Sequence, residues 1–261
     1  GLPAIEVSAD TLAVSGADTA PMIPADQEIA CVFTSGSTGA PQPHLKRWRS
    51  LRTNIDAEAR RLWATAGGPC AVLGTVPFQH MYGLESTVLL PRLGGGLLTA
   101  ERPFFPGDIA AALAALPTPR LLVTTPFHLR ALLDAELALP PLDLVVSATA
   151  PLAPELAQRA ETALKAPLLE IYGATETGQL ATRRTTTGEP WHTFDGIHLT
   201  QQAHLSMASG GHLDDDCPLN DLISLEDATH FRLIGRSSDM INVAGKRSSL
   251  AYLNHVLNGL D

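Results

Sequence analysis

The sequence predicts an α/β protein whose core is a parallel sheet built from strand–helix–strand units, followed by a smaller β-rich subdomain. Between residues 29 and 180, short apolar runs alternate with segments of helical periodicity. After about residue 180 that periodicity fades, and short alternating stretches rich in Thr, Gly and His follow. The chain has 261 residues, of which 45% are hydrophobic, so it carries enough apolar material for one large core.

The individual elements follow from this alternation. Apolar runs predict a short strand at residues 5–7 and buried strands at residues 29–34, 70–76, 97–99, 120–125, 142–148 and 168–172. Helical periodicity predicts helices at residues 46–66, 108–116, 127–137 and 154–164. In the first of these helices one face carries Trp48, Leu51, Ile55, Ala59 and Leu62.

We expect four segments along the chain. Residues 1–28 form an extended lead-in, residues 29–180 the α/β core and residues 181–238 the β-rich subdomain. Residues 239–261 form the start of a truncated C-terminal domain, with a strand first and a short helical run at 250–257. Because the first residue is Gly and not Met, we expect the natural start to be missing.

Charge and cysteine content narrow the class of protein. The net charge is −9 and there is no block of Lys or Arg, which argues against nucleic acid as a partner. No apolar run has the length of a membrane span, and no signal peptide opens the chain. The widely spaced Cys31, Cys70 and Cys217 argue against a disulfide framework or a zinc site. We therefore expect a cytoplasmic protein.

A run of glycines and hydroxyl residues follows the first strand of the core: Thr34, Ser35, Gly36, Ser37, Thr38 and Gly39. The glycines allow successive N–H groups to point into one concavity, and the hydroxyls add donors, which favours phosphate binding. A flexible turn is the alternative. No Lys follows Gly39 directly, which disfavours a Walker-type kinase or NTPase loop, and Ser37 is not centred between glycines as in a hydrolase elbow.

The segment Thr-Ser-Gly-Ser-Thr-Gly-Ala-Pro resembles the signature of the adenylate-forming, or AMP-binding, superfamily, which includes acyl- and aryl-CoA synthetases. The resemblance implies that this loop orders the β- and γ-phosphates of ATP. The family usually continues with Lys-Gly, where this chain has Gln42 and Pro43, so a cation expected at the phosphates is absent. Lys46 lies one helical turn further on and is the residue that could reach back.

Residues 77–83, Pro-Phe-Gln-His-Met-Tyr-Gly, match the family's Pro-x-x-His-x-x-Gly. The resemblance places Phe78, His80, Met81 and Tyr82 at the pocket for the carboxylic acid, with His80 also as a catalytic residue. A neutral imidazole can donate one hydrogen bond to a carboxylate and pack its face on an aryl or acyl group. Taken alone, His80 would be an ordinary structural histidine.

The sequence Tyr-Gly-Ala-Thr-Glu at residues 172–176 matches the family's Tyr-Gly-x-Thr-Glu. By resemblance, Tyr172 stacks on adenine, and Gly173 borders both the nucleotide and the acid. Thr175 contacts the α-phosphate, and Glu176 holds Mg²⁺, because a carboxylate suits a hard cation that bridges phosphates. The alternative is a helix start capped by Thr175 with Glu176 in its first turn, which leaves the preceding Tyr-Gly unexplained.

Two weaker matches concern the adenosine. Residues 147–152, Ser-Ala-Thr-Ala-Pro-Leu, stand where the family has Ser-Gly-Gly-Ala-Pro-Leu, which implies that Ala150 lies beside the adenine. Asp221 precedes Gly235 by fourteen positions (235 minus 221), as expected for the family's ribose-binding aspartate. An ordinary surface aspartate in a loop is the alternative.

Residues 235–247 match a longer family pattern, Gly-Arg-x-x-Asp-x-Ile-Lys-x-x-Gly-x-Arg, with Asn242 in place of the Lys. By resemblance, Arg236 reaches the ribose or the α-phosphate, Ser238 lies at a domain hinge, and the region of Gly245 lines the thiol tunnel. The resemblance thus covers roughly residues 30–247, with its motifs in family order.

The resemblance implies a ligase with ATP and Mg²⁺ as cofactors and two half-reactions. A carboxylic acid, expected to be small, aromatic and benzoate-like as in pigment or aryl polyene pathways, becomes an acyl adenylate. The acyl group then passes to the thiol of CoA or of an acyl carrier protein's phosphopantetheine. The family's late catalytic Lys is not present in this chain, so we expect weak turnover. A non-catalytic ATP/AMP-binding module and a fatty acyl ligase of the same fold are the alternatives.

Overall fold

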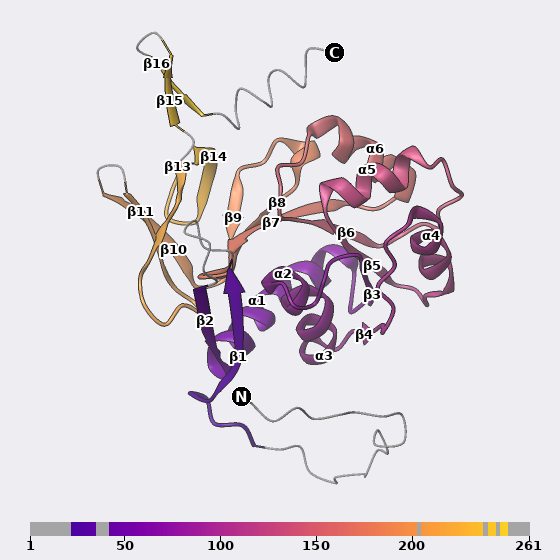
Figure 1. Cartoon of the computed structure of the whole chain (residues 1–261), viewed down its shortest axis with the longest axis horizontal. Coiled ribbons are helices and arrows are strands. Elements are labelled where there is room, and N and C mark those ends of the chain that lie inside the picture. The colour runs from indigo at the N-terminus through magenta and orange to yellow at the C-terminus, as the bar shows by residue number, and fades with distance from the viewer. Residues whose placement is uncertain (1–21, 35–41, 203–204, 237–239, 244–245, 250–261) are drawn as a thin grey trace.

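The computed structural model describes residues 22–34, 42–202, 205–236, 240–243 and 246–249 (Figure 1). A nine-stranded sheet forms its centre. Five strands are parallel: β3 (Ala71–Gly74), β4 (Leu97–Leu98), β5 (Arg120–Thr124), β6 (Leu144–Ser147) and β7 (Leu168–Ala174). Four antiparallel strands continue it: β8 (Gly178–Arg183), β9 (Trp191–Thr193), β13 (Asp221–Leu225) and β14 (His230–Arg236). The order is β13-β14-β9-β8-β7-β6-β5-β3-β4.

Helices cover both faces of the parallel half, which confirms the predicted α/β fold class. One face is covered by α4 (Pro106–Ala115), α5 (Pro126–Asp134) and α6 (Pro154–Leu164). The other face is covered by α1 (Trp48–Ala66) and α3 (Leu90–Gly94). Between β3 and α3 the chain forms a short helix α2 (Met81–Gly83) and one π-helical segment η2 (Leu84–Leu89), neither of which was predicted.

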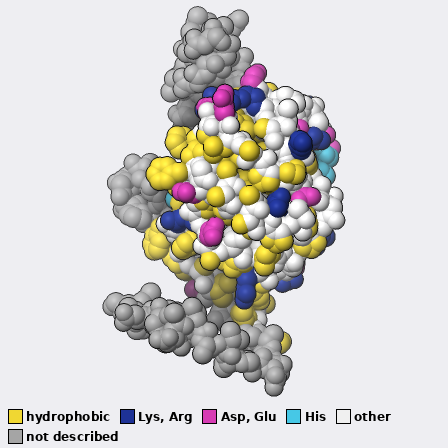
Figure 2. All heavy atoms as spheres, turned by 90° about the vertical axis from the view of Figure 1, so that its right-hand side faces the viewer, with side chains coloured by type: hydrophobic (Ala, Val, Ile, Leu, Met, Phe, Trp, Pro, Cys, Tyr) yellow, Lys and Arg dark blue, Asp and Glu magenta, His cyan; other side chains and the backbone are white. Residues whose placement is uncertain are grey.

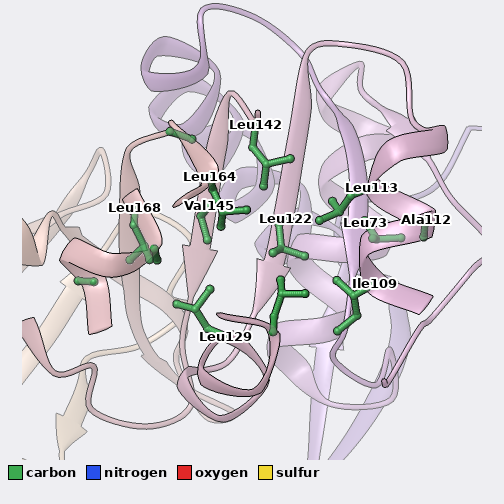
Figure 3. Packing of buried hydrophobic residues seen from close by; sticks show 14 of the residues in the cluster. Leu73, Ile109, Ala112, Leu113, Leu122, Leu129, Leu142, Val145, Leu164 and Leu168 are labelled. Atoms are coloured by element: carbon green, nitrogen blue, oxygen red, sulfur yellow. The ribbon is translucent and has the colours of Figure 1, made fainter. Parts of the chain in front are cut away.

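The strand interiors explain this three-layer arrangement, because neighbouring residues of a strand point to opposite faces. Leu122, Val145 and Leu168 join the cluster beneath α4, α5 and α6, part of which is drawn in Figure 3. Leu121 and Val123, on either side of Leu122, join the cluster beneath α1 and α3. Strands buried on both faces therefore appear in the sequence as continuous apolar runs.

Helix α1 begins at Trp48, two residues later than predicted. Four of the five residues expected on its inner face, Leu51, Ile55, Ala59 and Leu62, are buried, as are the polar Asn54 and Glu58, which the apolar pattern did not mark. The late start has a physical cause: the preceding residues belong to a strand.

That strand is β2 (Gln42–Arg47), which pairs antiparallel with β1 (Glu28–Thr34) in a separate two-stranded sheet. The strand predicted at residues 29–34 is therefore confirmed, but its predicted burial is wrong, and a second strand precedes the helix. Ile29 and Phe33 are 38% and 60% exposed, and Val32 is buried. Strand pairing of Thr34 with Gln42 returns the chain toward α1, and Pro43 is tolerated because neither strand has a second neighbour in that sheet.

The region beyond residue 180 is rich in strands, as expected. β10 (Ile197–Gln202), β11 (Leu205–Gly210) and β12 (Cys217–Leu219) form a three-stranded sheet, and η3 (Thr185–Thr187) is a 3₁₀ turn. β15 (Met240–Val243) and β16 (Lys246–Ser249) form a hairpin. Strands β8, β9, β13 and β14 belong to the central sheet, so both sides of the expected boundary at residue 180 share one sheet. The predicted strand at 5–7 and helical run at 250–257 lie outside the described residues.

On the face turned to the viewer in Figure 2, acidic and basic side chains are scattered among apolar ones. Within the described part of the chain, no helix combines the length and the apolar character that crossing a bilayer requires. The cysteines Cys31, Cys70 and Cys217 are free thiols.

Candidate active site

A cavity of about 420 Å³ lies at the carboxyl ends of the parallel strands. Its walls come from the segments that follow β3, β5, β6 and β7, and from the start of β8. In open α/β sheets, ligands bind in the crevice outside the carboxyl ends of the strands. The position of the cavity therefore follows from the topology of the sheet. Its lining residues show which of the predicted site residues lie together there.

The histidine motif forms one wall of this cavity. His80, Met81 and Tyr82 all line it. His80 is exposed and occupies the position before α2, and Met81 is buried. Phe78 is not among the lining residues: its ring is 58% exposed, and the guanidinium carbon of Arg102 lies 5.4 Å from the ring centroid. The structure thus brings three of the four predicted acid-pocket residues of this motif together.

Tyr82 also has a structural task. Its Oη lies 3.0 Å from the carbonyl oxygen of Thr124 and 3.1 Å from that of Val146, so its O–H connects the ends of β5 and β6. Burial raises the pKa of Tyr82 well above its ordinary value. The hydroxyl therefore stays protonated and serves as a donor to the scaffold.

The spacing of the histidine motif has a steric cause. A Cβ at Gly83 would lie 2.0 Å from the carbonyl oxygen of Pro77. The chain turns back on itself between these two residues so tightly that a side chain at the last position of the motif cannot fit. Pro77 and Gly83 therefore fix where His80 stands between them.

Thr175 and Glu176 lie in a turn that joins the antiparallel strands β7 and β8, so they do not begin a helix. Thr175 lines the large cavity, and the exposed Glu176 lines a second cavity of about 230 Å³ on the other side of the turn. Gly173 also lines the large cavity, and a Cβ there would lie 2.3 Å from the carbonyl oxygen of Gly178. The two strands approach each other too closely for any side chain at that position.

Lys46 is tied to this turn. Its Nζ donates to the carbonyl oxygen of Thr175 at 2.5 Å and to that of Glu176 at 3.1 Å. The side chain is only 9% exposed. Lys46 lies on β2 and not on a helix, so the predicted helical turn between it and the glycine-rich motif does not exist. The ammonium reaches the backbone of the Thr-Glu motif, 129 and 130 residues away in the sequence.

The structure gathers the predicted adenosine contacts in a second group. Tyr172 Oη donates to Asp221 Oδ2 at 2.9 Å, across 49 residues of sequence. Asp221 pairs with Arg236 between β13 and β14, so all three residues stand at neighbouring positions; the side chain of Arg236 lies outside the described part. The Tyr172 ring is supported by Phe231 at 5.4 Å and Trp191 at 5.7 Å between centroids.

The segment after β6 also borders the large cavity. Ala148 and Thr149 line it, whereas Ala150 is exposed and is not one of its lining residues. Thr149 has a φ of 78°, a conformation that β-branched residues rarely adopt. This residue stands where the related family pattern has glycine, which adopts positive φ without a steric penalty. The cavity wall therefore carries a strained residue.

Thr149→Gly is expected to raise the free energy of unfolding by about 1 kcal/mol, because it relieves that backbone strain. Urea denaturation of the variant and the wild type measures the difference. Thr149→Ala is the matched control: it keeps the Cβ and should recover only part of the gain. An unchanged or lowered stability of Thr149→Gly would show that contacts of the Thr side chain outweigh the strain.

Five polar residues that the sequence did not mark form a buried cluster at the wall of the cavity: Asn54 and Glu58 of α1, Glu85 and Ser86 of η2, and Gln179 of β8. Asn54 Nδ2 donates to Glu85 Oε1, Ser86 Oγ donates to Glu58 Oε1 at 2.7 Å, and Gln179 Nε2 donates to Ser86 Oγ at 2.9 Å. Polar residues on an otherwise apolar helix face were the available signal, because burying them requires such partners.

Burial shifts the titration of this cluster. It raises the pKa of Glu85 to about 8, with the charge of Glu58 as a further cause and with Lys46 and Asn54 opposing. Burial likewise raises the pKa of Glu58 to about 7, opposed by the hydrogen bond from Ser86. Burial lowers the pKa of Lys46 and of His212. Glu85 lines both cavities, so it forms part of the wall between them.

The remaining predicted residues lie outside the described part of the chain. They are Ser35, Gly36, Ser37, Thr38 and Gly39 of the phosphate motif, and Ser238 at the predicted hinge. Thr34 ends β1 and its side chain is likewise not described. Their assigned roles remain predictions.

The structure is that of an α/β protein with a cavity at the carboxyl edge of its sheet. The chain belongs to the AMP-binding enzyme family, whose model matches residues 3–202.

Known relatives of this chain include two CoA ligases. It is 33% identical over 230 residues to a 4-coumarate–CoA ligase of Rhodobacter capsulatus, covering 86% of this chain and 56% of that protein. It is 29% identical over 178 residues to a 4-chlorobenzoate–CoA ligase of Arthrobacter sp., covering 66% of this chain and 34% of that protein. The chain therefore spans only part of the length of the curated relatives it matches.

Two solved structures share the fold. O-succinylbenzoate coenzyme A synthetase (MenE) of Bacillus subtilis, in complex with AMP, has a TM-score of 0.76 at 18% identity. That match covers 90% of this chain and 55% of the other. ATP-bound MatB of Rhodopseudomonas palustris has a TM-score of 0.74 at 17% identity, covering 92% of this chain and 54% of the other. Both share the mixed α/β fold of this chain, which matches about half the length of each.

Proposed function

We propose that this chain is the nucleotide- and acid-binding part of an acid–thiol ligase, which activates a carboxylic acid with ATP as an acyl adenylate. The observation that carries the proposal is the joint placement of two motifs. His80 and Thr175, 95 residues apart (175 minus 80), line one cavity at the ligand edge of the sheet. Membership of the AMP-binding enzyme family supports the nucleotide.

The described residues fit a nucleoside monophosphate group. The Tyr172 ring packs against Trp191 and Phe231, and its hydroxyl donates to Asp221, whose carboxylate is an acceptor for ribose hydroxyls. Thr175 offers a hydroxyl at the cavity wall. Gly173 lines the same cavity, so the backbone of β7 borders the site at this position.

The residues also fit a magnesium ion that the nucleotide brings with it. Within the described ranges no group of three or more His, Cys, Asp or Glu could hold a metal, whereas Glu176 presents one exposed carboxylate. Mg²⁺ in nucleotide sites is bound by one or two carboxylates together with phosphates. When bound, the ion neutralises phosphate charge. Glu176 would hold it, Thr175 would orient the α-phosphate, and His80 would hold the acid by its imidazole.

For the acid we propose a small aromatic carboxylate. The large cavity is lined by the apolar Val76, Met81 and Ile171 beside the imidazole of His80, surfaces on which an aryl ring packs well. The relatives in Rhodobacter capsulatus and Arthrobacter are ligases of aromatic acids. A fatty acid is the competing substrate, since a long-chain-fatty-acid–CoA ligase of Bacillus subtilis is also a relative, at 26% identity.

For the acceptor we propose the thiol of CoA, which the names of these relatives support. An acyl carrier protein carries the same phosphopantetheine thiol and is the alternative acceptor. The free cysteines suit the reducing cytoplasm, where we propose that the protein acts.

One observation favours a second candidate, a module that binds ATP or AMP without turning it over. Gln42 stands where the family pattern has Lys, and Lys46 donates to two backbone carbonyls. Such a module would bind nucleotide but show no acid-dependent exchange of pyrophosphate into ATP.

The chain is expected to bind ATP in the presence of Mg²⁺, and Glu176→Gln is expected to weaken that binding about tenfold, because the ion loses its protein ligand. Isothermal titration calorimetry with Mg²⁺ and with EDTA measures the effect, and Glu189→Gln, an exposed carboxylate beyond η3, is the matched control. In EDTA the wild type and Glu176→Gln should bind equally.

Exchange of pyrophosphate into ATP, measured with different acids, then distinguishes between the candidate substrates and the non-catalytic module. Stimulation by 4-hydroxybenzoate or 4-coumarate supports the aromatic acid, and stimulation by palmitate alone assigns the cavity to fatty acids. ATP binding without exchange by any acid leaves the non-catalytic module. Absence of ATP binding by the wild type would refute the proposal.

A further inference from the structure

Lys46 is a buried lysine, and its hydrogen bonds belong neither to the apolar core nor to a surface ion pair. The strand that carries it, β2, belongs to a two-stranded sheet apart from the central one. Its ammonium donates to the carbonyl oxygens of two consecutive residues, Thr175 and Glu176. These are the residues to which the proposed function assigns the α-phosphate and the magnesium ion.

Neighbouring acidic groups offset part of the desolvation cost of burying this ammonium. Burial lowers the pKa of Lys46, and four groups from other elements oppose that shift: Glu85 of η2, Glu176 of the turn, Cys217 of β12 and Asp214 before it. His212, which also lines this side, donates from Nε2 to the carbonyl oxygen of Thr177, 2.7 Å away. An ammonium beside the carboxylates of Glu176 and Asp214 and the carbonyl dipoles of the turn is stabilised electrostatically, so the contact is more than packing.

Two hydrogen bonds to consecutive carbonyls constrain the turn strongly. They fix the planes of two neighbouring peptide groups, and these planes set the directions in which the Thr175 and Glu176 side chains leave the backbone. Thr175 then faces the large cavity and Glu176 the small one. Backbone pairing between β7 and β8 does not hold this part, because residues 175–177 form the turn outside the ladder.

We propose that Lys46 is a positioning residue, which holds the Thr175–Glu176 turn in the arrangement that binds the nucleotide and its metal. The inference rests on the proposed function for what the turn binds. It differs from a direct role of Lys46 at the phosphates, because the ammonium acts through the two carbonyls.

The test compares Lys46→Met with the wild-type chain in two measurements. Hydrogen exchange of the amides in residues 174–179, without nucleotide, reports whether the turn loosens. Calorimetric binding of ATP with Mg²⁺ reports the consequence. We expect faster exchange confined to this segment and about a tenfold loss of affinity, since small misplacements of binding groups are costly. Lys46→Arg should recover part of both, because it keeps the charge and donors. Lys165→Met, an exposed lysine that ends α6, is the matched control.

Each other outcome overturns the inference. Lost affinity with unchanged exchange would mean that Lys46 contacts the nucleotide directly. Faster exchange with unchanged affinity would mean that the contact only stabilises the fold. If Lys46→Met does not fold, Lys46→Gln, which keeps one donor group, takes its place with the same criteria. Failure of the wild type to bind ATP refutes the proposed function, whereas binding that Lys46→Met leaves intact refutes this inference alone.

Discussion

Gly178→Ala is expected to lower the free energy of unfolding by about 2–4 kcal/mol, through backbone strain and overpacking together. Gly178 has a φ of 69°, where an L side chain is disfavoured. A Cβ there would lie 2.9 Å from Glu85 Oε1, 3.0 Å from Asn54 Nδ2 and 3.3 Å from His212 Nε2. Glu85 and Asn54 are hydrogen-bonded to each other in the buried polar cluster, and His212 is hydrogen-bonded to the carbonyl oxygen of Thr177, so these atoms cannot move without breaking hydrogen bonds.

Gly188→Ala is the matched control for this experiment. Gly188 has nearly the same φ, 68°, but nothing lies within 4 Å of an added Cβ. The free energy of unfolding of Gly188→Ala should fall only by the cost of the backbone strain, about 1 kcal/mol. Urea denaturation of both variants separates strain from packing. Equal losses in the two variants would show that the cluster around Gly178 yields to the extra methyl group.

The stability of the wild type is expected to fall as the pH rises from 5 to 8.5. Glu58 and Glu85 have an ordinary pKa of 4.5 in the unfolded chain, and burial raises it to about 7 and about 8 in the folded chain. Between these values the folded chain keeps protons that the unfolded chain has lost, so raising the pH favours unfolding. The loss is absent below pH 4.5 and complete above about pH 8. Each carboxyl contributes at most about 1.4 kcal/mol per pH unit.

Glu85→Gln tests this origin of the pH dependence. The amide keeps an oxygen for the Asn54 donor but cannot ionise, so the variant should be about 2 kcal/mol more stable than the wild type at pH 8.5 and little changed at pH 5. Glu155→Gln, in the exposed first turn of α6, is the control and should follow the wild type at both pH values. Thermal unfolding at the two pH values measures the effect. A parallel fall in Glu85→Gln and wild type would place the titrating group elsewhere.

The predictions that depended on local sequence were confirmed where burial is strong. Continuous apolar runs such as 142–148 contain β6, and the helix predicted at residues 154–164 has those same bounds in the structure. Both signals arise because a strand or helix face must be apolar to be buried, whatever its partners are. Strand β1 is an exception to this relation between apolar residues and burial, because it is largely exposed. Its apolar residues resemble a core strand, yet only its pairing with β2 decides that it lies outside the central sheet.

In the candidate site, too, some features follow from the sequence and others only from the tertiary structure. The order of its motifs along the chain predicted the family, which is confirmed. The motifs also assigned residues to phosphate, acid and metal, because those chemistries demand particular residue types at short spacings, and these assignments stay predictions. Tertiary structure alone decided which of these residues come together: Tyr172 donates to Asp221, His80 and Thr175 line one cavity, and Lys46 donates to the backbone of the turn. Such contacts span tens of residues, and no local pattern encodes them.

The two buried acids, Glu58 and Glu85, show most clearly what only the tertiary structure decides. In the sequence, the polar Glu58 on a largely apolar helix face is the one signal of a buried acid, and nothing in the segment around Glu85 marks its carboxyl group as buried. Packing of α1 against η2 and β8 removes them from water, raises their pKa and places Glu85 between the two cavities. The sequence by itself determined the fold class and the chemistry of the motifs, since both follow from local composition and spacing. The tertiary structure decided burial, protonation and the partners of Lys46, because these depend on segments that only folding brings into contact.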